Sequence, residues 1–490
     1  MDNKLVQSTK WSGITELLSK IITPFVNLFL ARILAPEVFG VVATFTLVTT
    51  FADVFTDAGF QKYLVQHEFK DENDREQSTN VAFWTNFIFS CAVWVLIFIF
   101  RDKVASLVGS KGYGTEVAVM SLAIPMTALS SIQTALYRRD FKFKELLPIR
   151  VITCLVPLFV TLPLALALRN CWANIIGHLA KEIVFMTALT LRSTWKPKLY
   201  YSFEKLKEML SFSMTMMADS FMIWFTSYAG TFIVSHYLDM YYLGIYKTGI
   251  TTISTYMNLI YTITAPVFFS GLSRAQNNPD ECKKIYYAFQ RYCSLIVIPL
   301  GFGVFVYRDF VTRILLGNQW GDASLILGGI ALCMSITIVT AQFNSDYFRS
   351  QGRPKVALAV QSIYAAVMVI VLLITVQKPF NVLCIARFSL NLVYSSISTI
   401  AICVLFGISA KKIGRNLIFP IIGALIMSFV GVSLQRLSGS ILWTIISVFI
   451  CIITYFAVIL IIPASRADLL GIDFVQKWIK RLHNPKNLIK

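Results

Sequence analysis

Apolar segments of about 20 residues follow one another along the whole chain, and short polar segments separate them. A helix needs about 20 predominantly apolar residues to cross the roughly 30 Å hydrocarbon core of a bilayer, so each segment predicts one transmembrane helix. The predicted helices form a first set of six, a second set of six and a final pair: 12–34, 38–60, 79–100, 115–137, 146–168 and 171–191; 209–235, 239–268, 285–307, 323–347, 356–376 and 380–406; 414–434 and 440–463. The pattern therefore predicts an all-α integral membrane protein with about 14 transmembrane helices.

The composition supports the membrane class. Hydrophobic residues make up 56% of the 490 residues, charged residues make up 14%, and the mean hydropathy is +0.66. Ordinary soluble domains of this length are far less apolar. A formal net charge of +18 would suggest nucleic-acid binding in a soluble protein. Here most basic residues lie in alternate connections between the predicted helices, as expected for a membrane protein with a fixed orientation. No nucleic-acid partner is therefore expected.

The basic residues are concentrated in alternate connections between the predicted helices. One set of connections, together with the C-terminal tail, holds roughly 30 of the 44 Lys and Arg residues. The opposite set holds far fewer: Arg101, Lys103, Lys111, Arg169, Arg308, Arg313, Lys378 and Arg436. Because basic connections stay on the cytoplasmic side, both termini are predicted to be cytoplasmic, as an even number of helices also requires.

The longest basic connection, from Arg192 to Lys207, separates the two sets of six helices and is predicted to be an amphipathic cytoplasmic linker. The expected organisation is an N-terminal lobe, a C-terminal lobe, and a last part that holds the final helix pair and a basic amphipathic cytoplasmic tail: 1–200, 201–408 and 409–490. In the tail, Leu470, Phe474 and Trp478 share one helical face. Such a face is typical of a helix that lies on an anionic membrane surface.

A faint internal repeat relates the beginnings of the two sets. Arg32 precedes Gly40 by the same number of residues as His236 precedes Gly244. Each stretch is the short outer turn between the first two helices of its set. The spacing arises either by chance or from a duplicated lobe, as in many transporters.

Several short motifs resemble those of a known family. Residues 31–40, ARILAPEVFG, resemble the L-a-R-x-L-x-P-x-x-[FY]-G signature at the first hairpin of polysaccharide exporters of the Wzx type. These exporters belong to the multidrug/oligosaccharidyl-lipid/polysaccharide (MOP) flippase superfamily. Four further stretches resemble motifs of the same family: DAGF at 57–60 followed by VQ at 65–66, SRAQ at 273–276, LGNQW at 316–320 and QGRP at 351–354. Together the similarities cover nearly all of 8–460.

The resemblance implies two six-helix lobes around a central hydrophilic cavity, with two additional helices. It implies a flippase of the bacterial inner membrane that moves undecaprenyl-pyrophosphate-linked sugar repeats from the cytoplasmic to the outer leaflet by alternating access. The products would be surface polysaccharides such as O-antigen (lipopolysaccharide), capsule or exopolysaccharide. The implied partners are the lipid-linked oligosaccharide, membrane lipid, and a polysaccharide polymerase with its chain-length machinery. No covalent chemistry is needed, so neither an enzyme nor a cofactor is expected.

Ionisable residues inside the predicted helices are the candidates for lining such a cavity, because each costs about 2.5–3.5 kcal/mol at the bilayer centre. The expected substrate-binding residues are basic, to match a pyrophosphate: Lys20, Lys247, Arg32, Arg150, Lys181 and Arg387. Acidic residues are expected to serve ion coupling or charge pairing: Asp53, Asp57, Glu182 and Asp219. Side chains near helix ends can instead extend to the interface, and Lys181–Glu182 or Lys20–Asp53 can be structural pairs.

Two other classes of function fit less of the sequence. A cation-coupled drug or small-molecule antiporter of the same superfamily favours acidic and aromatic cavities, whereas this chain has embedded Lys and Arg residues. A membrane enzyme of polysaccharide assembly usually needs a large outer loop, and the longest outer connections, 101–114 and 308–322, are short.

The glycine pairs at 112–114 and 301–303 lack a phosphate-loop context, and the 4 His residues lack a metal-binding spacing. Transport is therefore expected to use an ion gradient, the membrane potential or cargo exchange instead of ATP.

Overall fold

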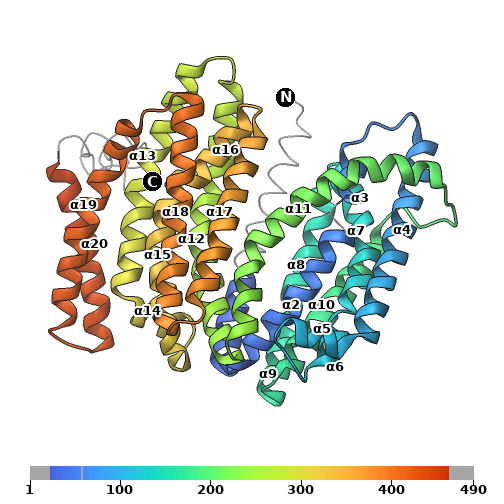
Figure 1. The fold of residues 1–490 in the computed structure, drawn as a ribbon, viewed down its shortest axis with the longest axis horizontal. Coiled ribbons are helices and arrows are strands. Elements are labelled where there is room, and N and C mark those ends of the chain that lie inside the picture. The colour runs from blue at the N-terminus through green and yellow to red at the C-terminus, as the bar shows by residue number, and fades with distance from the viewer. Residues whose placement is uncertain (1–21, 57–58, 463–490) are drawn as a thin grey trace, which may run out of the picture. The chain divides into compact units, whose positions relative to one another are not determined.

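The computed structural model describes residues 22–56 and 59–462, and its regular elements there are all helical (Figure 1). The described chain begins with a helix over Ile22–Ile33. The next helices are α2 Pro36–Thr56, α3 Phe60–Gln66, α4 Glu72–Ile99, α5 Arg101–Leu107, α6 Gly114–Met120, α7 Ala123–Arg139, α8 Phe143–Phe159, α9 Thr161–Leu168 and α10 Cys171–Arg192. The later helices are α11 Phe203–Tyr237, α12 Met240–Arg274, α13 Pro279–Val306, α14 Arg308–Leu315, η1 Asn318–Ala323, α15 Ser324–Thr337, η2 Ile338–Gln342, α16 Phe343–Ser350, α17 Pro354–Thr375, α18 Phe380–Phe406, α19 Ala410–Gln435 and α20 Ile441–Ile461.

The observed helices follow the predicted ones closely, but three of the predicted helices that lie wholly within the described residues are interrupted. The predicted helix 115–137 consists of α6 and α7, and 146–168 consists of α8 and α9. In both cases the second helix begins two residues before a proline, Pro125 or Pro163. A helix accepts proline most easily in its first turn, where the missing N–H would have no partner. The third, 323–347, contains the π-helical turn η2.

Ten helical segments of the described chain are long and apolar enough to cross a membrane. They are Pro36–Val54, Glu72–Ile99, Gly114–Arg139, Phe143–Leu168, Pro279–Val306, Asn318–Ser350, Pro354–Thr375, Phe380–Phe406, Ala410–Gln435 and Ile441–Ile461. The helices α10, α11 and α12 are 22, 35 and 35 residues long and have more polar sequences. The prediction of an all-α membrane protein is confirmed, and the count of about 14 spans stays a prediction.

Contacts divide the chain into two compact units, which are described separately below. Unit 1 comprises Met1–Thr248, Leu316–Trp320 and Leu372–Gln377. Unit 2 comprises Gly249–Leu315, Gly321–Val371 and Lys378–Lys490. The lobe boundaries expected from the basic linker stay a prediction.

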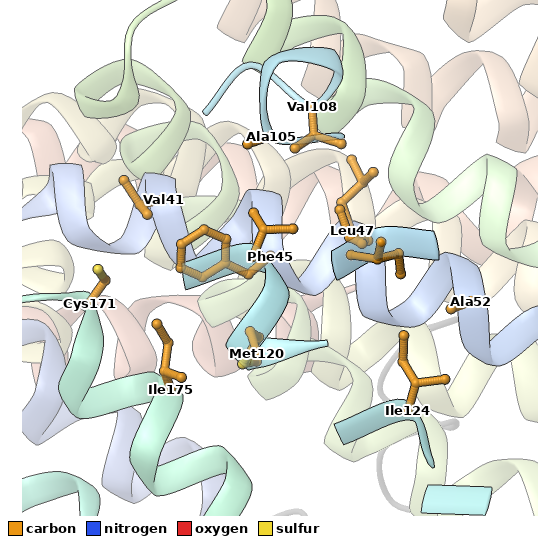
Figure 2. Packing of buried hydrophobic residues seen from close by; sticks show 13 residues of the cluster. Val41, Phe45, Leu47, Ala52, Ala105, Val108, Met120, Ile124, Cys171 and Ile175 are labelled. Carbon is orange, nitrogen blue, oxygen red and sulfur yellow. The ribbon is translucent and has the colours of Figure 1, made fainter. Parts of the chain in front are cut away.

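The centre of unit 1 is a hydrophobic cluster around α2 (Figure 2). Four members on α2, Val41, Phe45, Val48 and Ala52, recur at helical spacing, so one face of this helix is buried. Leu47, also on α2, belongs to the cluster as well. The other members come from α4 to α7 and α10 and from the residue after α5: Ile97, Ala105, Val108, Val117, Met120, Ile124, Cys171 and Ile175. Packing in this cluster holds α2 in place, and side chains outside the cluster are free to contact other helices of unit 1.

Two glycines mark the closest approach of α2 and α12 within unit 1. A Cβ built on Gly40, the fifth residue of α2, would lie 2.0 Å from the carbonyl oxygen of Met240. A Cβ on Gly244, the fifth residue of α12, would lie 1.9 Å from the carbonyl oxygen of Pro36. Each glycine thus faces the first residue of the other helix, and we call this arrangement the glycine crossing. The two glycines are those that the repeat aligns.

In unit 2, α13 packs against α15 and α19, and α19 packs against α20. The Tyr307 hydroxyl donates a hydrogen bond to Ser447 Oγ at 2.9 Å. The Tyr455 hydroxyl donates to the carbonyl oxygen of Leu295, also at 2.9 Å. These bonds attach the last helix pair to α13.

Candidate functional site

A row of aromatic side chains follows one face of α11 in unit 1. Phe221, Trp224 and Tyr228 are separated by three and four residues, a spacing that places them on one helical face. The ring centroids of Phe221 and Trp224 are 6.1 Å apart, and those of Trp224 and Tyr228 are 5.8 Å apart. The paired rings are nearly parallel, with interplanar angles of 27° and 19°. We call these three rings the aromatic row, which extends about 10 Å along the helix.

The helix α2 supports the aromatic row. The Trp224 indole nitrogen donates a hydrogen bond to Thr50 Oγ1 at 3.1 Å, and the ring centroid of Phe51 lies 4.9 Å from that of Trp224. Asp53, one turn further along α2, acts electrostatically on Tyr228. Since α2 is anchored in the hydrophobic cluster of unit 1, and Trp224 itself packs against that cluster, these contacts hold the row on a rigid support.

Lys247 lies at the Tyr228 end of the aromatic row. Its Nζ is 4.3 Å from the centroid of the Tyr228 ring. The short turn between α11 and α12 brings the two residues together. A Lys ammonium over an aromatic face gains about 0.5–1 kcal/mol when exposed and about 2 kcal/mol when desolvated. Two predicted site residues of opposite charge, Asp53 and Lys247, therefore both act on one tyrosine.

The aromatic row with Lys247 can bind a ligand that has both apolar faces and an anionic group. Flat rings offer large apolar surfaces to a ligand at a low conformational cost. Phe221 is 36% exposed, while Trp224, Tyr228 and Lys247 are half-buried. The row is therefore exposed at the Phe221 end and partly buried along the rest of its length.

A second group of predicted residues lies on α8 and α10 in unit 1. Lys181 Nζ is 3.1 Å from Glu182 Oε1, and the Glu182 side chain is 12% exposed. The guanidinium of Arg150 lies 5.8 Å from the centroid of the Phe185 ring. The sequence left open whether Lys181 and Glu182 form a structural pair, and their contact shows that they are paired in this conformation.

Arg32 lies at the end of the first described helix, where two of the family-like motifs meet. The Gln319 side chain donates to the carbonyl oxygens of Ala31 and Leu34 at 2.6 and 2.9 Å. The Trp320 indole donates to the Ala31 carbonyl at 2.7 Å. The LGNQW motif therefore caps the carbonyl end of this helix. The Arg32 side chain itself is exposed.

Four predicted residues remain to be placed. Arg387 is half-buried on α18 in unit 2. Lys20 and Asp57 lie outside the described residues, and Asp219 belongs to α11 but its side chain is not among those described. The roles assigned to all these residues from the sequence stay predictions.

One buried carboxylate was missed by the sequence reasoning. Asp346 on α16 in unit 2 is 7% exposed, and it accepts a hydrogen bond from the Tyr261 hydroxyl at 2.7 Å. It follows the π-helical turn η2, where Gln342 donates to Asn258 at 3.2 Å. Asp346 lies near the end of the predicted helix 323–347, so the search for embedded ionisable residues had the signal to find it.

The fold defines an all-α membrane protein of a known architecture. It matches the lipid II flippase MurJ in an inward closed conformation with a TM-score of 0.75, at 15% identity, covering 92% of this chain and 98% of that chain. It also matches an inward-facing multidrug resistance MATE family transporter of the MOP superfamily, with a TM-score of 0.59 at 13% identity, covering 81% and 98%. At these identities the likeness concerns the fold alone.

Sequence comparison then gives the family. The chain belongs to the family described as "Polysaccharide biosynthesis protein", which it matches over residues 29–325. The resemblance to Wzx-type proteins that the motifs indicated is thereby confirmed.

Curated relatives agree with this family. The succinoglycan biosynthesis transport protein ExoT of Rhizobium meliloti is 23% identical over 326 residues, which are 66% of this chain and 65% of that protein. The lipopolysaccharide biosynthesis protein WzxC of Escherichia coli is 20% identical over 326 residues, again 66% and 65%. An uncharacterised membrane protein in the cps region of Klebsiella pneumoniae is 22% identical over 324 residues. The match thus spans 65% of the length of these relatives.

Proposed function

We propose that this protein is a flippase that moves a lipid-linked oligosaccharide from the cytoplasmic to the outer leaflet by alternating access. The carrier lipid in this proposal is undecaprenyl pyrophosphate, and the product is a surface polysaccharide. The observation that carries the proposal is the aromatic row with Lys247 at its Tyr228 end. The family and the names of the relatives support the same class of cargo.

The physical problem in such transport is the head group. A pyrophosphate and a chain of hydroxyl-rich sugars lose many hydrogen bonds to water in hydrocarbon, and an unpaired buried ion costs several kcal/mol or more. Aromatic rings stack on the apolar faces of sugar rings, and an ammonium group neutralises a phosphate oxygen. The polyprenyl tail is apolar and can stay in the lipid while the head group crosses.

No covalent step belongs to this proposal, so the chain is not proposed to be an enzyme. Energy would come from an ion gradient, from the membrane potential or from cargo exchange, with Asp53 and Glu182 as proposed coupling residues. A polysaccharide polymerase and its chain-length machinery are proposed partners. The proposed location is the bacterial inner membrane, with both termini in the cytoplasm.

A drug or cation antiporter is the second candidate, because Asp53 beside the aromatic row would also suit a cationic ligand. The lipid-linked intermediates of a deletion strain distinguish the two functions. We expect undecaprenyl-linked repeat units to accumulate and surface polysaccharide to disappear, with both changes reversed by the gene on a plasmid. Normal polysaccharide together with increased sensitivity to cationic drugs would instead support the antiporter.

The orientation of the chain can be tested separately by cysteine labelling. Because basic connections stay in the cytoplasm, Lys205→Cys and Lys284→Cys are expected to resist an impermeant thiol reagent added from outside. Lys111→Cys, in a sparsely basic connection, is expected to react. The unaltered protein with its 9 native cysteines is the blank. Labelling of Lys205→Cys from outside would contradict the proposed orientation.

A further inference from the structure

A polar cavity of about 630 Å³ lies at one end of unit 1, away from the aromatic row. It is formed by the beginning of α4, the turn between α7 and α8, and the segment that follows α10. The lining residues are Glu72, Arg75, Glu76, Thr79, Leu136, Asp140, Lys142, Thr194, Trp195, Lys196 and Lys198. Four of these side chains are basic and three are acidic, so the cavity carries a net positive charge.

The acidic side chains of the cavity already have basic partners. Arg75 binds both carboxylate oxygens of Asp140, at 2.9 and 3.1 Å, and also contacts Glu72 at 3.3 Å. Glu76 pairs with Lys198. Just beside the cavity, Lys205 pairs with Asp74, and this hydrogen bond raises the pKa of Lys205.

Two lysines of the cavity keep binding capacity for an anion. Lys142 is 3.9 Å from Asp140, whose carboxylate is already held by Arg75. Lys196 donates to the carbonyl oxygen of Thr190, which is neutral. Each ammonium group has three N–H donors, so both lysines can bind a further acceptor.

Trp195 lines the same cavity and has an unsatisfied hydrogen-bond donor. Its ring packs against Phe83 with the centroids 5.6 Å apart. Its indole N–H is buried and has no acceptor among the described residues. A buried donor without an acceptor is unfavourable, and such groups are usually satisfied by a ligand or water.

The cavity lies at the boundary between water and lipid that the sequence predicts. Thr79 and Leu136 are at the ends of predicted transmembrane helices. The segment after Lys198 exposes large apolar side chains, with Leu199 93% and Phe203 79% exposed. Exposed apolar side chains next to lysines are typical of a segment at the level of lipid head groups.

We propose that this cavity binds the phosphate head group of an anionic phospholipid. Lys142, Lys196 and the Trp195 indole N–H donate to the phosphate oxygens, and the acyl chains lie along Leu199 and Phe203. An inorganic phosphate ion shares the first set of contacts but lacks the second. The site is separate from the aromatic row and does not depend on the proposed transport function.

The test measures the thermal unfolding midpoint of the full chain, purified in a neutral detergent, against the concentration of added phosphatidylglycerol. Phosphatidylcholine and inorganic phosphate are added in parallel. Phosphatidylglycerol is expected to raise the midpoint in a saturable way, and the other two are expected to have little effect. An equal response to phosphatidylcholine, or to inorganic phosphate alone, would overturn the proposal of an anionic-lipid site.

Variants connect the response to the cavity. Trp195→Phe keeps the aromatic ring but removes the N–H, and Lys142→Gln with Lys196→Gln removes two charges. Each change is expected to raise the half-saturating concentration of phosphatidylglycerol about tenfold, because charge-assisted hydrogen bonds are lost. Lys378→Gln, which removes one charge at an exposed lysine in unit 2, is the control and should respond like the unaltered protein. An unchanged half-saturating concentration of phosphatidylglycerol in both cavity variants would overturn the proposal. The thermal unfolding midpoints of the variants without added lipid show whether they fold.

Discussion

Replacing Lys247 by glutamine is expected to abolish surface polysaccharide or reduce it sharply, with a normal amount of protein in the membrane. The change removes the charge and shortens the side chain by only one atom, so the aromatic row loses the group that would hold the pyrophosphate. A hydrogen bond to a charged group is worth about 2 kcal/mol, which corresponds to roughly a 30-fold loss of affinity for an anion. Lys247→Arg is expected to keep part of the export, since it preserves the charge but changes the geometry. The measurements are cell-surface polysaccharide and protein level in a complemented deletion strain.

A matched control separates binding from structure. Lys103 also lies over an aromatic ring, at 5.7 Å from the centroid of Phe100, but it belongs to another part of unit 1. Lys103→Gln should therefore leave export unchanged. If Lys247→Gln exports normally, or if Lys103→Gln is equally defective, the assigned role of Lys247 is wrong.

Lys20 is the second predicted pyrophosphate ligand, and the same assay tests it. Lys20→Gln is expected to reduce export in the same way as Lys247→Gln. The alternative is a structural ion pair with Asp53, whose loss would leave a buried unpaired carboxylate. Recovery of export in the Lys20→Gln, Asp53→Asn double variant would support the structural pair and contradict the binding role of Lys20.

Alanine at Gly40 or at Gly244 is expected to prevent normal accumulation of folded protein. The added Cβ would lie 2.0 Å or 1.9 Å from a backbone carbonyl oxygen, and no side-chain rotation can relieve this contact. The two helices must move apart, and overpacking of this kind costs about 1–3 kcal/mol or more. The measurements are the amount of protein in the membrane and the thermal unfolding midpoint of the purified variant.

Gly414 provides the control for this experiment. It lies inside α19, and a Cβ built on it meets nothing within 4 Å. Alanine there is expected to be neutral or to stabilise the helix by up to about 1 kcal/mol, because alanine is the better helix former. The double variant of Gly40 and Gly244 should be less defective than the sum of the single ones, because both act at one crossing. Midpoints equal to that of the unaltered protein in both single variants would show that the crossing is not tight.

Much of the fold could be predicted because the spans are encoded locally. The length of each apolar segment sets where a helix begins and ends in a membrane, and no distant residue is needed for that inference. The interruptions before Pro125 and Pro163 agree with a local rule, although Pro266, Pro299 and Pro420 lie inside uninterrupted helices. The equal spacings before Gly40 and Gly244 were likewise visible in the sequence, although their mutual contact was not.

The sites depend on contacts between segments that are far apart in the chain. The spacing of Phe221, Trp224 and Tyr228 is readable, but only the packing of α2 and α12 against α11 makes these rings a supported row with Lys247 at one end. The contact of Trp320 with the Ala31 carbonyl joins residues separated by 289 positions. A periodic pattern specifies which face of a helix is apolar and leaves open which neighbour covers it.

The sequence by itself determined the membrane class, the position of most helices and the family, because hydrophobic length and short motifs are properties of contiguous residues. Only the tertiary structure decided which ionisable residues have partners. Lys181 lies beside Glu182, Asp346 is buried against Tyr261, and the cavity with Trp195 combines three separate segments. Electrostatic energy depends on the distance between charges and on their burial, and both quantities exist only once the helices are packed.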